Sequence, residues 1–150
     1  MADYEERLTV PLWWWPVAAG LVALLGAELH VGLSLPWKIG TYAVFGGLSA
    51  GLLVFASAAR VRVGDGELAA GRARLPLRYA GSVQVLDRTA TRAAMGPQAD
   101  PAAYTLTRPW LAGSVRVDVR DPADDTPYWL VGSRHPDRLA AALEAARSPV

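Results

Sequence analysis

The sequence predicts a helical membrane hairpin joined to a small β-rich α+β domain, a bent antiparallel sheet or partly open barrel capped by a C-terminal helix. Between residues 12 and 59 the chain is almost entirely apolar and carries only two charged residues, Glu28 and Lys38. Residues 60–150 instead contain 13 arginines and 10 acidic residues, a density of about 25% that is normal for a soluble domain. The absence of cysteine excludes a disulfide scaffold, and the apolar segment argues against a purely soluble enzyme or a disordered chain.

Residues 12–59 are predicted to form two antiparallel membrane spans, preceded by a cytoplasmic tail at residues 1–11. A bilayer core of roughly 30 Å needs about 20 helical residues, so the apolar segment is too long for one crossing and suits two. We expect the spans at residues 16–35 and 39–59, with a tight turn between them. The acidic leader and the length of the first span are unlike those of a cleaved signal peptide.

Basic residues predict the orientation of the hairpin, because lysine and arginine concentrate on the cytoplasmic side of membrane spans. The arginines that follow the second span are Arg60, Arg62, Arg72, Arg74 and Arg78. Both termini and residues 60–150 are therefore expected at the cytoplasmic face of the inner membrane, in a two-pass topology. The same arginines either only set this topology or also attract anionic lipid headgroups, at about 1 kcal/mol each.

Small residues recur every four positions on both spans, where they would let two helix backbones approach closely. The two sets are Ala19, Ala23 and Ala27 on the first span and Ala43, Gly47 and Gly51 on the second. They either close the hairpin within one chain or join two chains into a homo-oligomer. Residues 47–51 also match a G-x-S-x-G motif, but Ser49 lies in an apolar helix and not at the sharp turn that a nucleophile elbow needs.

Glu28 and His30 are the ionisable residues expected inside the spans. Such groups are candidates for a function because charge inside the bilayer is costly. Two positions apart, they point about 200° away from each other around a helix, so they do not chelate one metal from the same face. Either their side chains reach the headgroups or bond within the hairpin, or they form an intramembrane polar site for protons or a ligand.

From residue 60 the apolar pattern becomes alternating, which is typical of half-buried strands. The predicted strands are 60–63, 67–70, 73–77, 82–86, 114–120 and 128–133, with a hairpin turn at 64–66 and a loop at 121–127. Short helices are expected at 89–95 and 136–147. The second of these carries an apolar stripe that would close the sheet, formed by Leu139, Ala142, Leu143 and Ala146.

Residues 60–68 and 128–139 resemble the opening hairpin and the final strand and helix of bacterial pleckstrin-homology-like domains, which are commonly tethered below two-helix hairpins. The whole chain also resembles an actinobacterial family of two-span membrane proteins of unknown function. The segments that carry this second likeness are Tyr4–Leu8, Trp13–Pro16, Arg108–Trp110 and Asp121–Trp129. The resemblance implies a pleckstrin-homology-like cytoplasmic domain at residues 60–150, and such a fold alone implies no ligand.

The domain offers no recognised catalytic, metal or cofactor site. Its one histidine, His135, precedes a helix-starting proline and is expected to help form that turn. The spacing of Asp121, Asp124 and Asp125 departs from a calcium-binding loop, and no zinc-ligand spacing or phosphate-binding glycine loop occurs. A net charge of +3 over residues 60–150, without a basic stripe, argues against nucleic-acid binding.

Trp110, Tyr128 and Trp129 either form an exposed aromatic patch for a protein partner or fill a small core. Tyr128 and Trp129 are neighbours on a strand, so at least one should point outward unless another element covers it. We therefore expect a non-enzymatic interaction or scaffolding module at the inner leaflet, with membrane lipids and a protein as partners and no cofactor. The rival hypothesis is a hairpin subunit that takes part in transport or lipid chemistry through Glu28 and His30.

Overall fold

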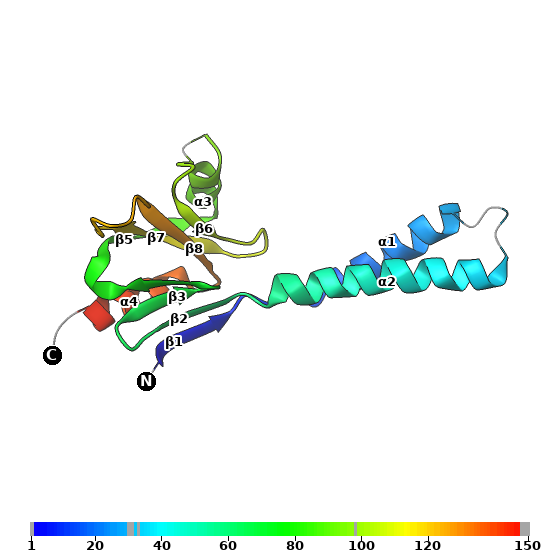
Figure 1. Cartoon of the computed structure of the whole chain (residues 1–150), viewed down its shortest axis with the longest axis horizontal. Coiled ribbons are helices and arrows are strands. Elements are labelled where there is room, and N and C mark those ends of the chain that lie inside the picture. Colours follow the sequence, from blue (N-terminus) through cyan, green and yellow to red (C-terminus); the bar gives the residue numbers. More distant parts are fainter. Residues whose placement is uncertain (1, 30–31, 33, 98, 148–150) are drawn as a thin grey trace. The chain divides into compact units, whose positions relative to one another are not determined.

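The computed structural model describes residues 2–29, 32, 34–97 and 99–147 and divides the chain into two compact units. The helical unit is Thr9–Ala58, and the α+β unit combines the residues up to Leu8 with those from Ala59 onward. The helical unit is therefore an insertion within the sequence of the α+β unit. The elements of both units are labelled in Figure 1.

The described part of the α+β unit contains two four-stranded sheets. The first is antiparallel in the order β1 (Ala2–Arg7), β2 (Arg60–Gly64), β3 (Glu67–Ala70) and β4 (Ala73–Pro76). The second has the order β5 (Ala80–Asp87), β7 (Gly113–Val119), β8 (Tyr128–Ser133) and β6 (Tyr104–Leu106), in which β6 runs parallel to β8.

The β-rich α+β class is confirmed, and the strands form two sheets that are not closed, instead of one bent antiparallel sheet. Pro76 ends β4 and the single 3-10 turn Leu77–Tyr79 follows it, so the ladder is interrupted before β5 begins. Proline has no N–H to donate to a ladder, which favours a break at this point. The strands on either side of the turn consequently belong to different sheets.

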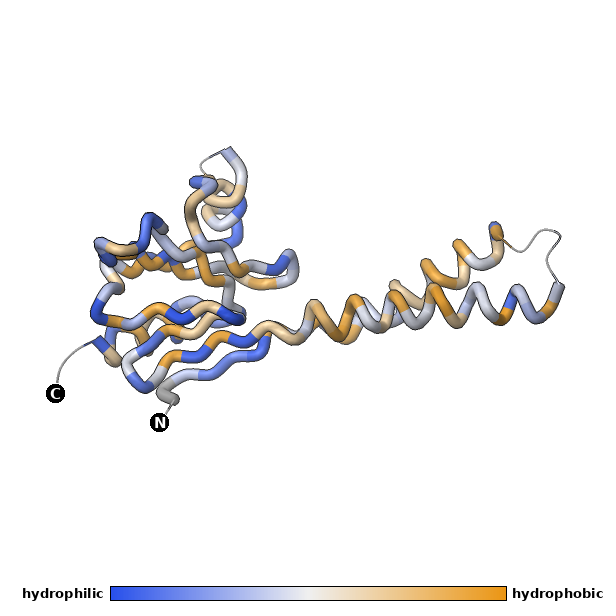
Figure 2. Tube along the Cα trace, in the orientation of Figure 1, coloured by the Kyte–Doolittle hydropathy of each residue, from blue (hydrophilic) through white to orange (hydrophobic). Residues whose placement is uncertain are grey.

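Strands β2 and β3 form the predicted hairpin. Its turn places Asp65 and Gly66 at positive φ, 54° and 76°, as a two-residue turn with both central residues left-handed requires. Val61, Val63 and Leu68 are fully buried. The alternation of apolar and polar residues that predicted these strands is visible along the sheet in Figure 2, where orange and blue segments follow one another.

The predicted capping helix is confirmed as α4 (Pro136–Arg147). Its Leu139 and Leu143 are fully buried, and the helix contacts strands of both sheets. Val115 and Val117 of β7 enter the same core as Val61 and Val63 of β2. One core therefore joins the two sheets through the apolar stripe of α4.

Residues 1–11 were predicted to be a tail, but Ala2–Arg7 form strand β1 of the first sheet. It pairs with β2 in an antiparallel register that sets Arg7 opposite Arg60, and Leu8 just after it is fully buried. The Leu8 N–H donates to the Ala59 carbonyl at 3.0 Å. The residues that leave for the helical unit and those that return from it are thus held side by side in the first sheet.

The helical unit consists of α1 (Trp14–Leu29) and α2 (Leu35–Ser57), packed as an antiparallel pair. The first predicted span extended to residue 35, but α1 ends at Leu29 and Leu35 begins α2. At the open end of the pair, the Val10 N–H donates to Ser57 Oγ at 3.1 Å, and Ser57 Oγ donates to the Leu53 carbonyl at 2.8 Å.

Candidate functional site

The helical unit exposes large apolar side chains along its whole length. Trp37 is 71% exposed and Phe55 is 72% exposed, and α1 and α2 are orange through much of their length in Figure 2. In the described part of the α+β unit, by contrast, the exposed large hydrophobic residues are Val85 and Met95 alone. An apolar surface of this extent is typical of contact with lipid or with other helices.

Within the described residues, one helix has the length and composition to cross a membrane. It is α2, with 23 residues, whereas α1 is apolar but has 16. At roughly 1.5 Å per residue, α1 extends about 24 Å, which is shorter than a bilayer core of roughly 30 Å. Length and composition therefore support membrane association of α2.

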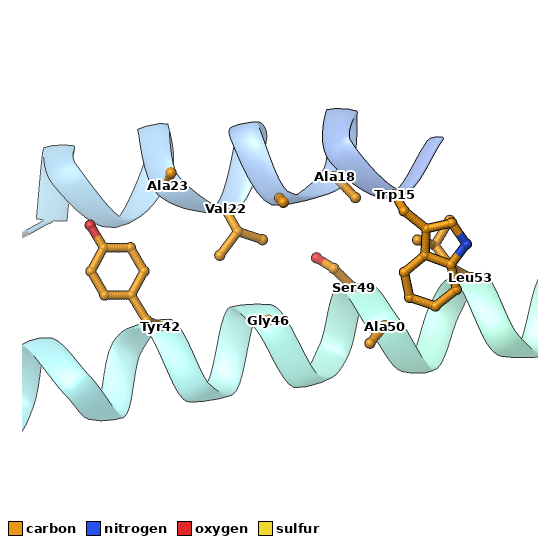
Figure 3. A pocket seen from close by; sticks show the side chains of 10 residues that line it. Trp15, Ala18, Val22, Ala23, Tyr42, Gly46, Ser49, Ala50 and Leu53 are labelled. Carbon is orange, nitrogen blue, oxygen red and sulfur yellow. The ribbon is translucent and has the colours of Figure 1, made fainter. Parts of the chain in front are cut away.

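The two helices enclose an apolar groove of about 280 Å³ (Figure 3). Trp15 and Leu53 stand at one end of it, and Tyr42 stands at the other. Ser49 directs its hydroxyl toward α1 in the middle of an uninterrupted helix, so the G-x-S-x-G segment does not form a nucleophile elbow.

The ring of Tyr42 on α2 packs tightly against the backbone of α1 at Gly26. A Cβ atom built on Gly26 would lie 2.1 Å from Cε1 of Tyr42, so only a residue without a side chain fits against this ring as it stands. Gly26 is the buried residue of α1. Gly26 of α1 and the ring of Tyr42 of α2 therefore fit against each other.

The small-residue sets predicted to close the hairpin lie only partly between the helices. Ala19 and Ala23 line the groove. A Cβ atom built on Gly47 or Gly51 meets nothing within 4 Å, and the α2 residues that face α1 are Tyr42, Gly46, Ser49, Ala50 and Leu53. The contact face of α2 is rotated by one residue from the predicted one, and it places Tyr42 over Gly26. Ala27, Ala43, Gly47 and Gly51 are exposed, and a homo-oligomer through this face stays a prediction.

Glu28 is exposed near the end of α1. His30 lies outside the described residues, so a joint polar site of Glu28 and His30 stays a prediction. Among the described residues, no group of three or more histidine, cysteine or acidic side chains is arranged to hold a metal ion.

The five arginines predicted to face lipid are all exposed, and three of them lie beside carboxylates. Arg62 Nη2 lies 3.0 Å from Asp65 Oδ2, and Arg74 Nη1 lies 3.5 Å from Glu67 Oε2. Arg60 Nη1 lies 3.9 Å from Glu5 Oε1. The guanidinium group of Arg78 stacks over the ring of Tyr79, 4.7 Å from its centroid, and Arg72 occupies the turn between β3 and β4.

Tyr128 and Trp129 do not form an exposed aromatic patch, because each is only 5% exposed. Trp129 packs in the core with its ring centroid 4.5 Å from that of Tyr104. Tyr128 faces the other side of β8, where the loop after α3 covers it: the Asp100 N–H donates to the Tyr128 hydroxyl at 3.2 Å. Arg116 lies over the Tyr128 ring at 3.9 Å. Trp110 is half-buried against the core.

A polar cluster that the sequence did not reveal joins β1 to the end of β8. Glu6 Oε2 accepts from Ser133 Oγ at 2.6 Å and from the Tyr4 hydroxyl at 2.7 Å, while Glu6 Oε1 accepts from the Arg134 N–H at 2.9 Å. Ser133 is fully buried and its Oγ accepts the His135 N–H at 2.9 Å, so His135 contributes to the turn into α4. Burial, together with the hydrogen bond to Glu6, raises the pKa of Tyr4 to about 12.

Comparison with known families shows what the chain is similar to. A family model described as "Protein of unknown function (DUF3093)" matches residues 3–143. The chain belongs to this family. The comparisons with curated proteins and with solved structures found no match.

The matched range includes the helical unit as well as the α+β unit. It begins within β1 and ends within α4, and α1 and α2 lie inside it. The family pattern therefore describes an α+β domain together with its helical insertion, and not one of the two units alone.

Proposed function

We propose that the protein is a membrane-anchored, non-enzymatic interaction module whose helical hairpin holds the α+β unit at the inner leaflet of the cytoplasmic membrane. The observation that carries the proposal is the insertion of an apolar helical unit between two paired strands. Residues up to Leu8 and residues from Ala59 onward belong to one folded unit, so they must lie on the same side of a membrane.

This connection restricts the number of crossings to an even number. If α2 crosses the bilayer, the segment before it must cross back, because β1 and β2 pair with each other. The 16 residues of α1 are the apolar helix available for the return. A helix of about 24 Å can span a core of roughly 30 Å when the bilayer thins locally or flanking residues reach the interface. Trp13 and Trp15, both exposed, suit that interface.

Positive charge at the junction supports a cytoplasmic location of the α+β unit. Arg7 and Arg60 are directly opposite each other in the β1–β2 ladder, immediately before and after the helical unit. Like charges placed opposite one another weaken a ladder, whereas an anionic inner leaflet would attract both. Arg62, Arg72, Arg74 and Arg78 follow along the same sheet and the turn after it.

The α+β unit supplies the interaction surface in this proposal. Its two sheets with α4 packed on both support a pleckstrin-homology-like organisation, from which the parallel β6–β8 pair departs. Because Tyr128 and Trp129 are buried, a partner would meet a surface that is mainly polar and rich in arginine. Membrane lipids and a protein remain the proposed partners, and tethering would raise the effective concentration of either.

Single cysteines test the topology, since the natural chain has none. We suggest Ser34→Cys between the two helices, Glu5→Cys in β1 and Ala145→Cys in α4, all at exposed positions. Membrane vesicles of known orientation are treated with an impermeant maleimide, before and after permeabilisation. Ser34→Cys should react from outside the cell, while Glu5→Cys and Ala145→Cys should react only from the cytoplasmic side.

Two outcomes contradict the proposal. Reaction of all three cysteines from the cytoplasmic side would show that the hairpin does not cross the membrane. Reaction of Glu5→Cys and Ala145→Cys from opposite sides would contradict the β1–β2 pairing itself. A photo-crosslinking amino acid at Val85 or Met95 then tests the interaction role, and reproducible capture of lipid without protein would count against scaffolding.

The alternative function is a hairpin subunit that acts in transport or lipid chemistry. The exposed carboxylate of Glu28 on an apolar helix favours it. Glu28→Gln removes the charge with little change of shape. An unaltered cellular phenotype in this variant would reject the alternative, whereas a lost phenotype with normal membrane insertion would support it.

A further inference from the structure

Three arginines of the α+β unit converge on a cavity of about 260 Å³ that belongs to none of the sites described above. The cavity lies between α3 (Arg88–Met95) and the segment that links β6 to β7. Its basic lining residues are Arg88 and Arg92 from α3 and Arg108 from the linking segment. Met95, Pro109 and Leu111 contribute apolar surface.

The fold fixes the face of α3 that borders this cavity. Arg88, Arg92 and Met95 are spaced by four and three residues and therefore share one face of the helix. Asp87 caps the N-terminus of the helix, and its carboxylate accepts the Ala90 N–H at 2.7 Å. On its buried side, Thr91 Oγ1 lies 2.8 Å from Ser114 Oγ of β7. The arginines are consequently carried by a helix that is anchored to the sheet.

Backbone carbonyls hold two of the guanidinium groups in place. Arg88 Nη2 donates to the Leu111 carbonyl at 3.3 Å, and Arg108 Nη1 donates to the Thr107 carbonyl at 3.0 Å. A guanidinium group has five N–H donors, so each retains several for a ligand. Among the described residues, none of the ion pairs involves Arg88, Arg92 or Arg108, and no acidic residue lines the cavity.

This combination fits one ligand chemistry. Three clustered cations repel one another, and a dianionic group between them would remove that repulsion. A phosphate monoester carries a charge of about −1.5 to −2 at neutral pH and offers three acceptor oxygens, which match the fork of arginine donors. The volume lies just below the roughly 300–1,000 Å³ of sites for drug-sized molecules, so the organic part must be small.

We propose that this cavity binds the phosphate group of a small phosphate monoester whose organic part rests on Met95, Pro109 and Leu111. The site does not depend on the membrane topology, because it lies wholly within the α+β unit. The monoester can be a soluble metabolite or the headgroup of a phosphatidic-acid-type lipid, since both present the same group.

Calorimetric titration of the full chain in a non-ionic detergent and a phosphate-free buffer tests the proposal. The soluble probes are phenyl phosphate, inorganic phosphate and phenol, and the lipid probes are short-chain phosphatidic acid and short-chain phosphatidylcholine. Phenyl phosphate should bind more tightly than inorganic phosphate, and phenol should not bind. Phosphatidic acid should bind, and phosphatidylcholine should not, if the cavity is open to a lipid source.

Exposed arginines allow matched variants with little risk to folding. Arg92→Gln should weaken binding of phenyl phosphate by about tenfold or more, because it removes charge-assisted hydrogen bonds. Arg92→Lys keeps the charge but not the fork, so its loss should be smaller. Arg72→Gln, at an exposed position outside the cavity, should change affinity less than twofold. Met95→Ser should weaken the binding of phenyl phosphate and leave the binding of inorganic phosphate unchanged.

The outcomes separate the source of the ligand from the existence of the site. Binding of phenyl phosphate alone indicates a soluble ligand, and binding of phosphatidic acid indicates a lipid ligand, provided that Arg92→Gln weakens that binding by about tenfold or more. The proposal is overturned if none of the phosphate probes binds at millimolar concentration. It is also overturned if Arg72→Gln lowers affinity as much as Arg92→Gln, because binding would then follow surface charge alone.

Discussion

Removal of the Glu6 carboxylate should release β1 from the α+β unit. Glu6 accepts three hydrogen bonds, and two of the donors, Ser133 and Arg134, lie at the end of β8 in the other sheet. Strand β1 is an edge strand that pairs only with β2 among the described strands. The side-chain contacts of Glu6 therefore add a second attachment to a strand that otherwise depends on one ladder.

The magnitude follows from the burial of the donors. Ser133 is fully buried, and a buried hydroxyl that loses its acceptor costs about 1–3 kcal/mol. The Tyr4 hydroxyl and the Arg134 N–H are more exposed and can turn to water, so they contribute less. We expect Glu6→Ala to cost about 2–3 kcal/mol, which is roughly a 30- to 150-fold change in an equilibrium constant.

Hydrogen exchange followed by mass spectrometry on the full chain in detergent measures this change at β1 and β2. Amides of β1 should exchange faster by about that factor in Glu6→Ala. Glu5→Ala is the matched control, because Glu5 is exposed on the same strand and its pair with Arg60 is a surface contact worth about 0–1 kcal/mol. Equal acceleration in the two variants would refute the role assigned to Glu6.

Three further predictions concern single contacts. Tyr4→Phe should reduce the loss of stability above pH 10. The folded protein keeps the Tyr4 proton up to a pKa of about 12, so the free energy of unfolding of the wild type falls as the pH rises from 10 to 12. Alkaline denaturation curves of the two proteins test this prediction. Gly26→Val should separate the helices, whereas Gly47→Val should not, because Gly26 faces the Tyr42 ring and Gly47 faces open space; cysteine crosslinking between α1 and α2 distinguishes them. Tyr104→Phe should cost about 1 kcal/mol in urea denaturation, since it removes the 2.7 Å hydrogen bond from the Tyr104 hydroxyl to the Ala70 carbonyl.

Local patterns predicted those elements whose signals lie within a few residues of one another. The alternation from Arg60 onward and the Asp65-Gly66 turn gave the β2–β3 hairpin, and the stripe of Leu139 and Leu143 gave α4. In these elements the local sequence favours the same secondary structure that packing in the shared core requires. Their boundaries in the structure differ from the predicted ones by at most one residue.

Elements that depend on distant partners were not predictable in the same way. Strand β1 contains four charged residues and becomes a strand through pairing with β2, more than 50 residues away in the sequence. Strand β6 has three residues and is held by parallel pairing with β8. Tyr128 is buried because the loop after α3 covers it, and nothing in the alternation of β8 records that cover.

In the candidate sites as well, the sequence shows which residue types are present but not which of them come into contact. Small residues recur on both predicted spans, but the bulk of Tyr42 selects Gly26 as the point of contact, and abundance alone could not show that. Arg88, Arg92 and Arg108 are ordinary members of an arginine-rich sequence until α3 folds against β7. The i, i+4 spacing of Arg88 and Arg92 is the sequence signal that could have indicated a basic helix face.

The position of the helical unit bears directly on the stability of the first sheet. An unstructured insertion of the length of Thr9–Ala58 would oppose pairing of β1 and β2 by a loop-closure cost of about 3.5 kcal/mol, by the logarithmic dependence on loop length. Antiparallel helices bring the ends of the insertion together, and the Val10–Ser57 hydrogen bond joins them at the base. Formation of the helical hairpin therefore removes much of the loop-closure cost of pairing β1 with β2. An intact hairpin and the Glu6 contacts thus act on the same strand, and weakening either should first release β1 and leave the core around α4 in place.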